Sequence, residues 1–284
     1  MIIFKKAGEL KNFLKTKRSD NKKVGFVPTM GALHAGHISL VDAAKKENDI
    51  VACSIFVNPT QFNDPDDFKK YPVTLEKDIL LFEAAGCDVL FIPAVTEIYP
   101  NGTKNLAHYD LGFLETVLEG KFRPGHFQGV CQVVHRLLEV VLPDNLYLGQ
   151  KDYQQCMVIK RLIGLIELDN KIKVNICPTL REDDGLAMSS RNVRLSPGER
   201  KKATTIFVAL RYIKENIKKG NLSGIKLKAQ EMLLENGFTL DYLEIADGNT
   251  LELIEDWDGK RKIVSLAAAF PGDVRLIDNM VINP

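Results

Sequence analysis

Two histidines three residues apart, His34 and His37, follow an apolar run at 24–28 that predicts a strand. They end the segment P-T-M-G-A-L-H-A-G-H, which leads into a helical pattern at 38–44. Glycines at a strand-to-helix turn admit a ligand close to the backbone, and a helix N-terminus offers unpaired N–H groups and a positive dipole end. Both imidazoles can lie on one side of the first helical turn and stabilise charge that builds up on a phosphate. The segment therefore predicts a phosphate site.

Two simpler interpretations of the histidine pair stay open. The imidazoles could bind a metal ion, although no H-E-x-x-H helix or nearby third ligand accompanies them. The pair could also only cap the helix. A dinucleotide site is disfavoured, because G-x-G-x-x-G spacing is missing and Asn58, not an acidic residue, follows the second predicted strand.

Three further polar clusters, at 58–62, 149–155 and 188–191, follow predicted strands or the predicted domain boundary. In an open parallel sheet, ligands bind beyond the carboxyl ends of the strands, so we expect these clusters to meet the histidines there. Lys151 and Arg191 supply positive charge, and Ser189 and Ser190 supply hydroxyl donors. Asp152 could accept from ribose hydroxyls. Gln61 and Gln155 supply neutral amides that can orient a carboxylate.

Composition limits the classes of protein to consider. The 284 residues are 45% hydrophobic and 26% charged, so a large core can form without disulfides or metals. The 38 basic and 37 acidic residues nearly cancel, which gives no general attraction to nucleic acid. Without a signal-peptide pattern or a membrane-length apolar run, the sequence predicts a cytoplasmic protein that binds no membrane. The five cysteines are widely spaced and are expected to be buried thiols; they are Cys53, Cys87, Cys131, Cys156 and Cys177.

Short apolar runs alternate with helical patterns in the first part of the chain, which is typical of a parallel sheet covered on both faces. Strands are predicted at 24–28, 50–57, 88–92, 146–148 and 172–176, and an apolar stripe from Val130 to Val141 predicts a core helix.

The pattern changes after about residue 180. A capping box at Ser196–Glu199 predicts a long helix to about 219, followed by a helix around 227–235. Antiparallel strands are expected at 242–246, 263–269 and 274–277. The predicted fold is a Rossmann-like doubly wound parallel sheet in domain 1–179 and a smaller α+β domain in 180–284.

The remaining histidines and the acidic residues give weaker signals. The loop at 123–127, R-P-G-H-F, contains Arg123 and His126 and is either a structural turn or part of the site. His108 and His135 are expected to have surface or packing roles. The acidic residues match no calcium loop and are predicted to lie in a solvated loop and helix start; they are Asp64, Asp66, Asp67, Glu76 and Asp78.

Six motifs taken together are similar to those of the pantoate-beta-alanine ligase family, within the nucleotidyltransferase superfamily that carries a HIGH-type histidine motif. The resemblance runs from about residue 22 to the C-terminus, and the motifs read in order H-A-G-H, F-V-N-P-T-Q-F, R-P-G-H-F, G-Q-K-D-Y-Q-Q, M-S-S-R-N and R-L-I-D-N. The resemblance implies an ATP-dependent ligase. In that reaction the pantoate carboxylate attacks the α-phosphate to give pantoyl adenylate and pyrophosphate, and the amine of beta-alanine then releases AMP and forms pantothenate.

The resemblance also implies which residues bind ATP. They lie in four segments and are Met30, Gly31, Ala32, Leu33, His34, Ala35, Gly36 and His37; Gly149, Gln150, Lys151 and Asp152; Leu180; and Met188, Ser189, Ser190 and Arg191. The groups expected to act in catalysis are His34, His37, Lys151, Ser189, Ser190 and Arg191, and His37 matches the position of a proton donor. Gln61 matches a residue that contacts pantoate and beta-alanine, and Gln155 one that contacts pantoate.

The resemblance further implies a homodimer. Mg²⁺ is expected to arrive mainly on the ATP phosphates. In the family an acidic cluster after a Tyr-Pro motif can lie near metal, but here Lys77 stands between Glu76 and Asp78 after Tyr71-Pro72, so no protein-borne metal site is predicted. Two other functions stay open. One is a nucleotidyltransferase that leaves the nucleotide on a phosphorylated acceptor, and the other is a nucleotide sensor without turnover. Because 188–191 lies beyond the predicted boundary, the smaller domain is expected to form part of a lid over ATP.

Overall fold

The computed structural model describes residues 1–63 and 65–283. The chain forms two compact units, of which the first comprises Met1–Gly149 with Gln155–Pro178 and the second comprises Gln150–Gln154 with Thr179–Pro284. The sequence placed a single boundary between residues 179 and 180. The structure groups the short segment 150–154 with the C-terminal residues instead, and the three predicted ATP-site residues in that segment, Gln150, Lys151 and Asp152, therefore belong to the second unit.

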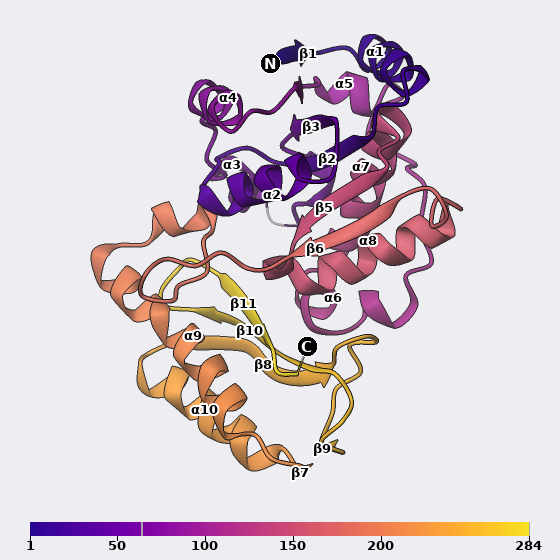
Figure 1. Cartoon of the computed structure of the whole chain (residues 1–284). Helices are drawn as coiled ribbons and strands as arrows, with labels where there is room; N and C mark the ends of the chain where they lie inside the picture. The colour runs from indigo at the N-terminus through magenta and orange to yellow at the C-terminus, as the bar shows by residue number, and fades with distance from the viewer. Residues whose placement is uncertain (64, 284) are drawn as a thin grey trace. The chain divides into compact units, whose positions relative to one another are not determined.

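A six-stranded parallel sheet forms the centre of the first unit (Figure 1). Its spatial order is β1-β4-β3-β2-β5-β6, and every pairing is parallel. Five strands match the predicted runs, whereas β1 is too short to give a pattern in the sequence. The strands are β1 (Ile2–Phe4), β2 (Val24–Thr29), β3 (Ile50–Ile55), β4 (Val89–Phe91), β5 (Asn145–Gly149) and β6 (Lys173–Cys177).

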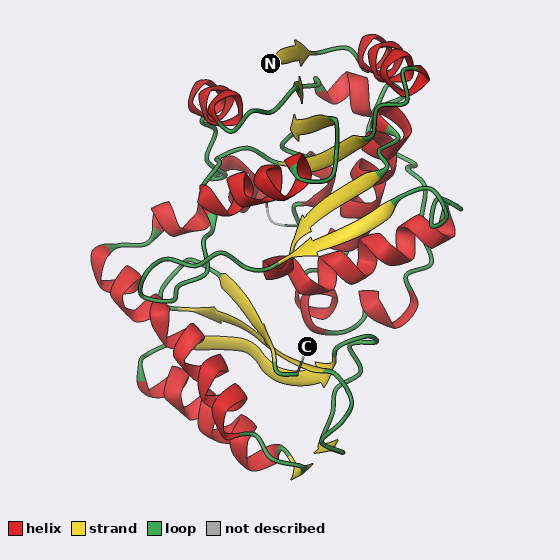
Figure 2. Ribbon diagram, viewed as in Figure 1, coloured by secondary structure: helices red, strands yellow, loops and turns green. Residues whose placement is uncertain are grey.

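Helices cover this sheet, as Figure 2 shows by colour. Short 3-10 helices, labelled η, follow some of the strands. In chain order the helical elements are α1 (Ala7–Ser19), α2 (Ala35–Lys45), η1 (Pro59–Gln61), α3 (Pro65–Lys69), α4 (Leu75–Ala84), α5 (Val95–Ile98), η2 (Gly112–Glu115), α6 (Leu118–Phe122), α7 (His126–Val141), η3 (Gln150–Asp152) and α8 (Tyr153–Leu165).

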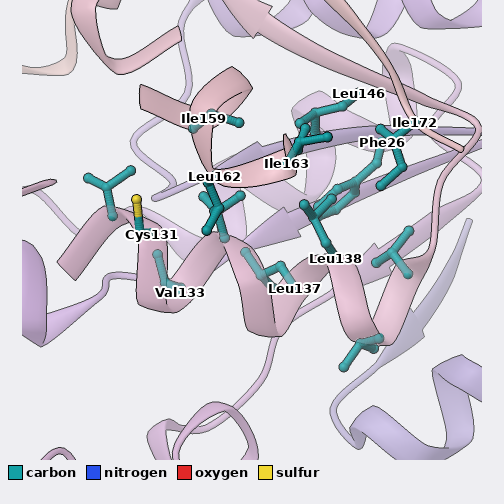
Figure 3. Close-up of a cluster of buried hydrophobic side chains, with 14 of the residues drawn as sticks. Phe26, Cys131, Val133, Leu137, Leu138, Leu146, Ile159, Leu162, Ile163 and Ile172 are labelled. Atoms are coloured by element: carbon teal, nitrogen blue, oxygen red, sulfur yellow. The ribbon is translucent and has the colours of Figure 1, made fainter. Parts of the chain in front are cut away.

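Successive strand residues point to opposite faces, and this alternation builds two hydrophobic clusters. Phe26 packs with residues of α7 and α8, whereas Val27 packs on the other face with residues of α2 and α4. Figure 3 shows Leu137 and Leu138 of the predicted α7 stripe lying near Phe26. Burial of both faces explains why the strand sequences read as continuous apolar runs.

The second unit has its own core and an antiparallel sheet in the order β11-β10-β8. The predicted capping box is confirmed, because Ser196 Oγ accepts from Glu199 N and Glu199 Oε2 accepts from Ser196 N. The elements are η4 (Ser190–Arg194), α9 (Pro197–Asn216), β7 (Gly220–Asn221), α10 (Ser223–Glu235), β8 (Thr239–Asp247), β9 (Asp256–Trp257), β10 (Ile263–Phe270) and β11 (Leu276–Val281).

The predicted fold class, a parallel α/β sheet with a smaller C-terminal α+β part, is confirmed. The five cysteines form no disulfide within the described residues, and four are buried as predicted, whereas Cys177 at the end of β6 is only half-buried. Within the described residues, no helix combines the length and the apolar character needed to cross a membrane.

Candidate active site

The histidine segment begins with a sharp turn where β2 ends. Thr29 Oγ1 donates to Ser54 O at 2.7 Å and accepts from Gly31 N at 3.2 Å. Gly31 has φ +81°, and a Cβ there would lie 2.9 Å from Asp78 Oδ2. Only glycine meets both conditions without strain, so Gly31 lets the backbone approach the Asp78 carboxylate.

Asp78, in the first helical turn of α4, fixes the backbone of the Gly31 turn through hydrogen bonds. Its Oδ2 accepts from Ala32 N and its Oδ1 from Leu33 N, both at 2.8 Å, and Thr74 Oγ1 donates to Oδ1 at 3.1 Å. The residue is only 1% exposed. The prediction of a solvated helix start is therefore wrong for Asp78. Neutral backbone donors satisfy this buried carboxylate, which fixes the two peptide units that precede His34. Asp64, from the same predicted acidic run, lies outside the described residues.

His34 and His37 form a reciprocal cap at the start of α2. His34 Nδ1 accepts from Gly36 N at 3.2 Å, and His37 Nδ1 accepts from His34 N at 3.3 Å. The ring centroids are 4.0 Å apart with an interplanar angle of 37°. Since both Nδ1 atoms accept, the proton of each neutral imidazole is assigned to Nε2. The two histidines therefore do cap the helix, and in this tautomer the Nε2–H is the donor of each ring.

Most backbone N–H groups of this segment already have partners inside the protein. The donors at Gly31, Ala32, Leu33, His34 and Gly36 go to the side chains named above, and His37 N donates to His34 O at 2.8 Å. The expected cradle of unpaired N–H groups is therefore wrong for these six residues. The α2 dipole and the imidazole side chains are the groups through which this segment can interact with an anion.

A buried amide network surrounds Gln61 at the end of η1. Asn58 is fully buried, and its Nδ2 donates to Gly129 O at 3.0 Å and to Gln61 Oε1 at 3.2 Å. Gln61 Nε2 in turn donates to Met30 Sδ at 2.8 Å. The structure thus brings together Met30 and Gln61, two predicted ligand-binding residues. Because thioether sulfur is a weak acceptor, a substrate oxygen can replace it as the partner of Nε2.

Backbone groups fix the direction of the Asn58 amide. A carbonyl can only accept and an N–H can only donate, so Gly129 O requires Nδ2 on one side and Thr60 N requires Oδ1 on the other, at 3.3 Å. Tyr99 Oη then donates to Oδ1 at 2.8 Å. Asn58 therefore donates to the Gln61 amide oxygen, which directs the amide nitrogen of Gln61 toward Met30 Sδ.

The R-P-G-H-F loop, left open by the sequence, contacts this same network. His126 is 5% exposed, and its Nδ1 donates to Gln61 O at 2.7 Å, because the carbonyl can only accept. Its Nε2 lies 3.1 Å from Arg123 Nη1, and Arg123 pairs with Glu119 at 3.6 Å. His126 thus holds the backbone of Gln61 while Asn58 holds its side chain.

Gly129 in α7 permits the close approach of this loop. A Cβ at Gly129 would lie 2.3 Å from Thr60 O, so a larger residue would displace η1. No pattern in the sequence singles out Gly129 or Tyr99, because their contacts with Asn58 join segments that are distant in the chain.

An apolar cavity of about 280 Å³ opens at the carboxyl ends of β3 and β4 in the first unit. Its wall includes Met30 and Ala32 of the histidine segment and Asp78 beneath it, together with Ile55 and Ile92. This position agrees with the rule that ligands bind beyond the carboxyl ends of parallel strands.

In the second unit, residues 180–188 form a small hairpin. Arg181 and Ala187 make an antiparallel bridge, and Met188 N donates to Leu180 O at 3.1 Å. The predicted ATP-site residues Leu180 and Met188 are therefore neighbours. Ser189 Oγ then accepts from Arg191 N at 3.2 Å and caps η4, which contains Ser190 and Arg191.

The R-L-I-D-N motif in β11 joins this hairpin to the segment that contains Lys151. Asp278 makes a bidentate pair with Arg181, at 2.6 Å from Nη1 and 3.0 Å from Nη2. Asn279 Nδ2 donates to Gln150 O at 2.9 Å and to Lys151 O at 2.8 Å. Burial raises the pKa of Asp278, and the Arg181 guanidinium opposes this shift. One β-strand thus positions two of the predicted ATP segments.

Comparison with known proteins decides the family. The family model described as pantoate-beta-alanine ligase matches residues 2–281. The chain belongs to the pantoate-beta-alanine ligase family. A relative named pantothenate synthetase from Caldicellulosiruptor bescii is 45% identical over 286 residues, covering 100% of this chain and 99% of the relative. One of the same name from Cytophaga hutchinsonii is 45% identical and covers 99% of both chains.

Solved structures of this ligase family have the same fold. A crystal structure of pantothenate synthetase from Thermus thermophilus has a TM-score of 0.90 at 40% identity and covers 100% of both chains. A pantoate-beta-alanine ligase from Francisella tularensis, solved with beta-gamma ATP and beta-alanine, has a TM-score of 0.81 at 40% identity and covers 99% of this chain and 98% of that one. The predicted enzyme class, a ligase of pantothenate synthesis, is confirmed.

The remaining predicted residues of this ligase divide between the two units. Gly149 ends β5, and Gln155 is half-buried in the first turn of α8, both in the first unit. Lys151 is 18% exposed and lies 3.8 Å from Asp152, in the second unit. His135 on α7 bonds to Tyr109 Oη at 2.7 Å, in agreement with a packing role.

Proposed function

We propose that the protein condenses pantoate with beta-alanine to pantothenate at the expense of ATP, through pantoyl adenylate. The observation that carries this proposal is the family match over residues 2–281, in agreement with a 40% identical relative that was solved with beta-gamma ATP and beta-alanine. A carboxylate oxygen of pantoate forms a bond to the α-phosphorus, and the bond from that phosphorus to pyrophosphate breaks. In the second step the amine nitrogen bonds to the acyl carbon and AMP leaves.

In the first step the protein has to position the reactants and stabilise negative charge. A carboxylate is already ionised at neutral pH and needs no general base. We assign charge stabilisation on the phosphates to the Nε2–H groups of His34 and His37, to Lys151, and to the Ser189–Arg191 turn. The capped geometry of the histidines supports neutral imidazoles that donate hydrogen bonds, because a protonated Nδ1 could not accept from the backbone.

The glutamines are assigned to the organic substrates. Gln61 presents its Nε2 to an oxygen of pantoate in exchange for Met30 Sδ, and it borders the site of beta-alanine. Gln155 is assigned to pantoate. Neutral amides orient the carboxylate without the tight ion pair that would weaken it as a nucleophile.

We assign Mg²⁺ to the ATP phosphates rather than to a site of its own on the protein. The described residues contain no group of three or more His, Cys, Asp or Glu side chains that could hold a metal ion. Asp78, the buried acid nearest the histidine segment, already accepts from two backbone N–H groups and a threonine. When bound with ATP, the ion would neutralise phosphate charge.

Three further proposals concern the whole protein. The assigned ATP residues are divided between the two units, and we propose that the second unit acts as part of a lid during turnover. Scattering profiles that are identical with and without ATP plus pantoate would contradict this closure. We also propose a homodimer in the cytoplasm, which sedimentation and fractionation would test.

Product analysis tests the reaction. Purified protein incubated with ATP, pantoate and beta-alanine is expected to form AMP, pyrophosphate and pantothenate in equal amounts. Omission of beta-alanine should leave pyrophosphate release from a single turnover, because the adenylate forms first. If the formation of AMP does not depend on pantoate, the ligase assignment is wrong. Pyrophosphate without AMP would instead indicate nucleotide transfer to an acceptor.

A further inference from the structure

We infer that Asn279 is a positioning residue for Lys151: it fixes the lysine to the second unit, as part of one set with the hairpin at 180–188. This inference rests on the proposed role of Lys151 at the ATP phosphates. Lys151 comes two residues after the end of strand β5, and the predicted domain boundary after residue 179 assigned it to the domain of the parallel sheet. The structure places it in the second unit.

The contacts of Asn279 account for this placement. Asn279 is 2% exposed, and its Nδ2 donates to the two consecutive carbonyl oxygens of Gln150 and Lys151. Gln150 Nε2 donates back to Asn279 Oδ1 at 3.3 Å. Because carbonyl oxygens can only accept, the amide direction is determined. Asn279 therefore holds the peptide on each side of the Lys151 Cα and limits where the ammonium group can reach.

The neighbouring residue connects Lys151 to the other ATP segment. Asp278 pairs with Arg181, which also donates to Gly185 O at 3.1 Å inside the hairpin and to Asn279 O at 3.3 Å. Two adjacent residues of β11 thus hold the two segments, one through a donor and one through an acceptor. A second anchor, Tyr153 Oη to Gly248 O at 2.6 Å, ties the same short segment to the C-terminal unit.

The arrangement predicts a specific consequence for catalysis. Strand β11 holds the Lys151 backbone through Asn279 and the hairpin that precedes Ser189 and Arg191 through Asp278, all within one unit. Loss of the Asn279 amide would free the Gln150–Lys151 backbone without removing any group that contacts substrate. The cost should therefore fall on the step in which the Lys151 charge acts, formation of the adenylate.

The test compares two asparagines with the same bonding pattern. Asn283 Nδ2 also donates to two consecutive carbonyls, Lys260 O at 3.2 Å and Arg261 O at 2.8 Å, in a loop that contains no assigned site residue. Pantoate-dependent pyrophosphate release is measured in a single turnover for Asn279→Ala and Asn283→Ala. We expect a loss of about ten- to hundredfold for Asn279→Ala, from two hydrogen bonds, and less than about twofold for Asn283→Ala.

A double-mutant cycle separates positioning from general damage. In a Lys151→Ala background, Asn279→Ala should change the rate by less than about twofold, because the side chain that it positions is gone. Hydrogen exchange of the amides at 150–154 should rise in Asn279→Ala and stay unchanged in Asn283→Ala. Thermal unfolding identifies a variant that fails to fold, and Asn279→Ser then replaces Asn279→Ala in the same cycle.

Equal losses in the wild-type and Lys151→Ala backgrounds, or equal losses in the two asparagine variants, would overturn the inference. A wild-type protein that makes no pantothenate would instead overturn the proposed function. The two failures are therefore distinguishable.

Discussion

The histidine segment of the first unit and the Lys151 segment of the second unit are held by side chains of opposite character. Asp78 is a buried acceptor that takes two consecutive backbone N–H groups, those of Ala32 and Leu33. Asn279 is a buried donor that takes two consecutive carbonyls, those of Gln150 and Lys151. Each fixes a short stretch of chain through two bonds to the backbone.

Because one support is an acceptor and the other a donor, different groups of each segment remain to interact with a phosphate. In the first unit the loop N–H groups are used by Thr29, by Asp78 and by the cap, so the proposed donors to a phosphate are imidazoles at a helix N-terminus. In the second unit two carbonyl oxygens, which would repel a phosphate, accept from Asn279, and the proposed source of positive charge is the Lys151 ammonium group. In both places the protein uses side chains on a fixed backbone, rather than a flexible glycine loop.

The largest effect is expected for His37, which has two roles that can be separated. His37→Ala removes both the Nε2–H and the cap to His34 N, and should lower adenylate formation by about a hundred- to a thousandfold. It should also lower the free energy of unfolding by about 1 kcal/mol. His37→Asn can keep an acceptor near the Nδ1 position without the distant donor. We expect His37→Asn to recover the stability and to leave the rate low; recovery of the rate would assign His37 to the cap alone.

The next effect tests whether the buried carboxylate positions the histidines. In Asp78→Asn one of the two acceptors becomes a donor that faces a backbone N–H, which should destabilise the fold by about 2 kcal/mol. The turn before His34 then moves, and kcat should fall by about tenfold or more, a factor that corresponds to about 1.4 kcal/mol. Glu76→Gln is the matched control, because Glu76 is exposed in the same helical turn. Normal kcat in folded Asp78→Asn would show that the imidazoles do not depend on this carboxylate.

The sequence predicted the sheet well because burial on both faces leaves a direct pattern. The runs at 24–28 and 50–57 contain residues for both clusters, such as Phe26 and Val27, and they fold as β2 and β3. The capping box at Ser196–Glu199 is also local, and it appears as predicted. Elements that leave a pattern within a short stretch of the chain could therefore be read from the sequence.

The supports of the site could not be read in the same way. Asp78 looks like an ordinary acidic residue at a helix start, and only the fold brings its carboxylate under Ala32, 46 residues away. Asn279 is separated from Lys151 by 128 residues. Motif order pointed to the R-L-I-D-N segment, but the direction of each hydrogen bond depends on tertiary structure. The sequence therefore predicted which segments form the candidate site, but it could not show which residues fix their backbone.

A smaller effect is expected from the network around Gln61. Tyr99→Phe removes one donor to Asn58 Oδ1, while the bond from Thr60 N remains. The amide of Gln61 should lose part of its fixed direction, and the KM for pantoate should rise between about twofold and tenfold while the KM for ATP stays unchanged.

Tyr147→Phe provides the control for that measurement. Tyr147 is also buried, and its hydroxyl accepts from Asn48 Nδ2 at 2.8 Å, so it loses a similar tyrosine–asparagine bond away from Gln61. If both variants change the KM for pantoate to the same extent, the effect is general and Tyr99 has no specific influence on Gln61. A rise confined to Tyr99→Phe would show that the Tyr99 hydroxyl helps to fix the direction of the Gln61 amide.

The smallest effect is expected at the tip of the hairpin, where Arg200 Nη1 donates to Asp184 Oδ2 at 2.7 Å. This hydrogen bond holds the pKa of Asp184 below its ordinary value of 3.8, so its stabilisation is present above that pH and is lost as the pH falls toward the lowered value. Both side chains are partly exposed, and Arg200→Ala should therefore lower the free energy of unfolding by about 0.5 kcal/mol at pH 7. Urea unfolding at pH 7 and below pH 3 would show the difference between variant and wild type shrinking with acid. Adenylate formation should stay within about twofold, because Asp278 and Asn279 fix the base of the hairpin and the Lys151 segment without this contact. A loss of rate as large as that of Asn279→Ala would show that the tip of the hairpin, rather than β11, fixes the position of the Lys151 segment.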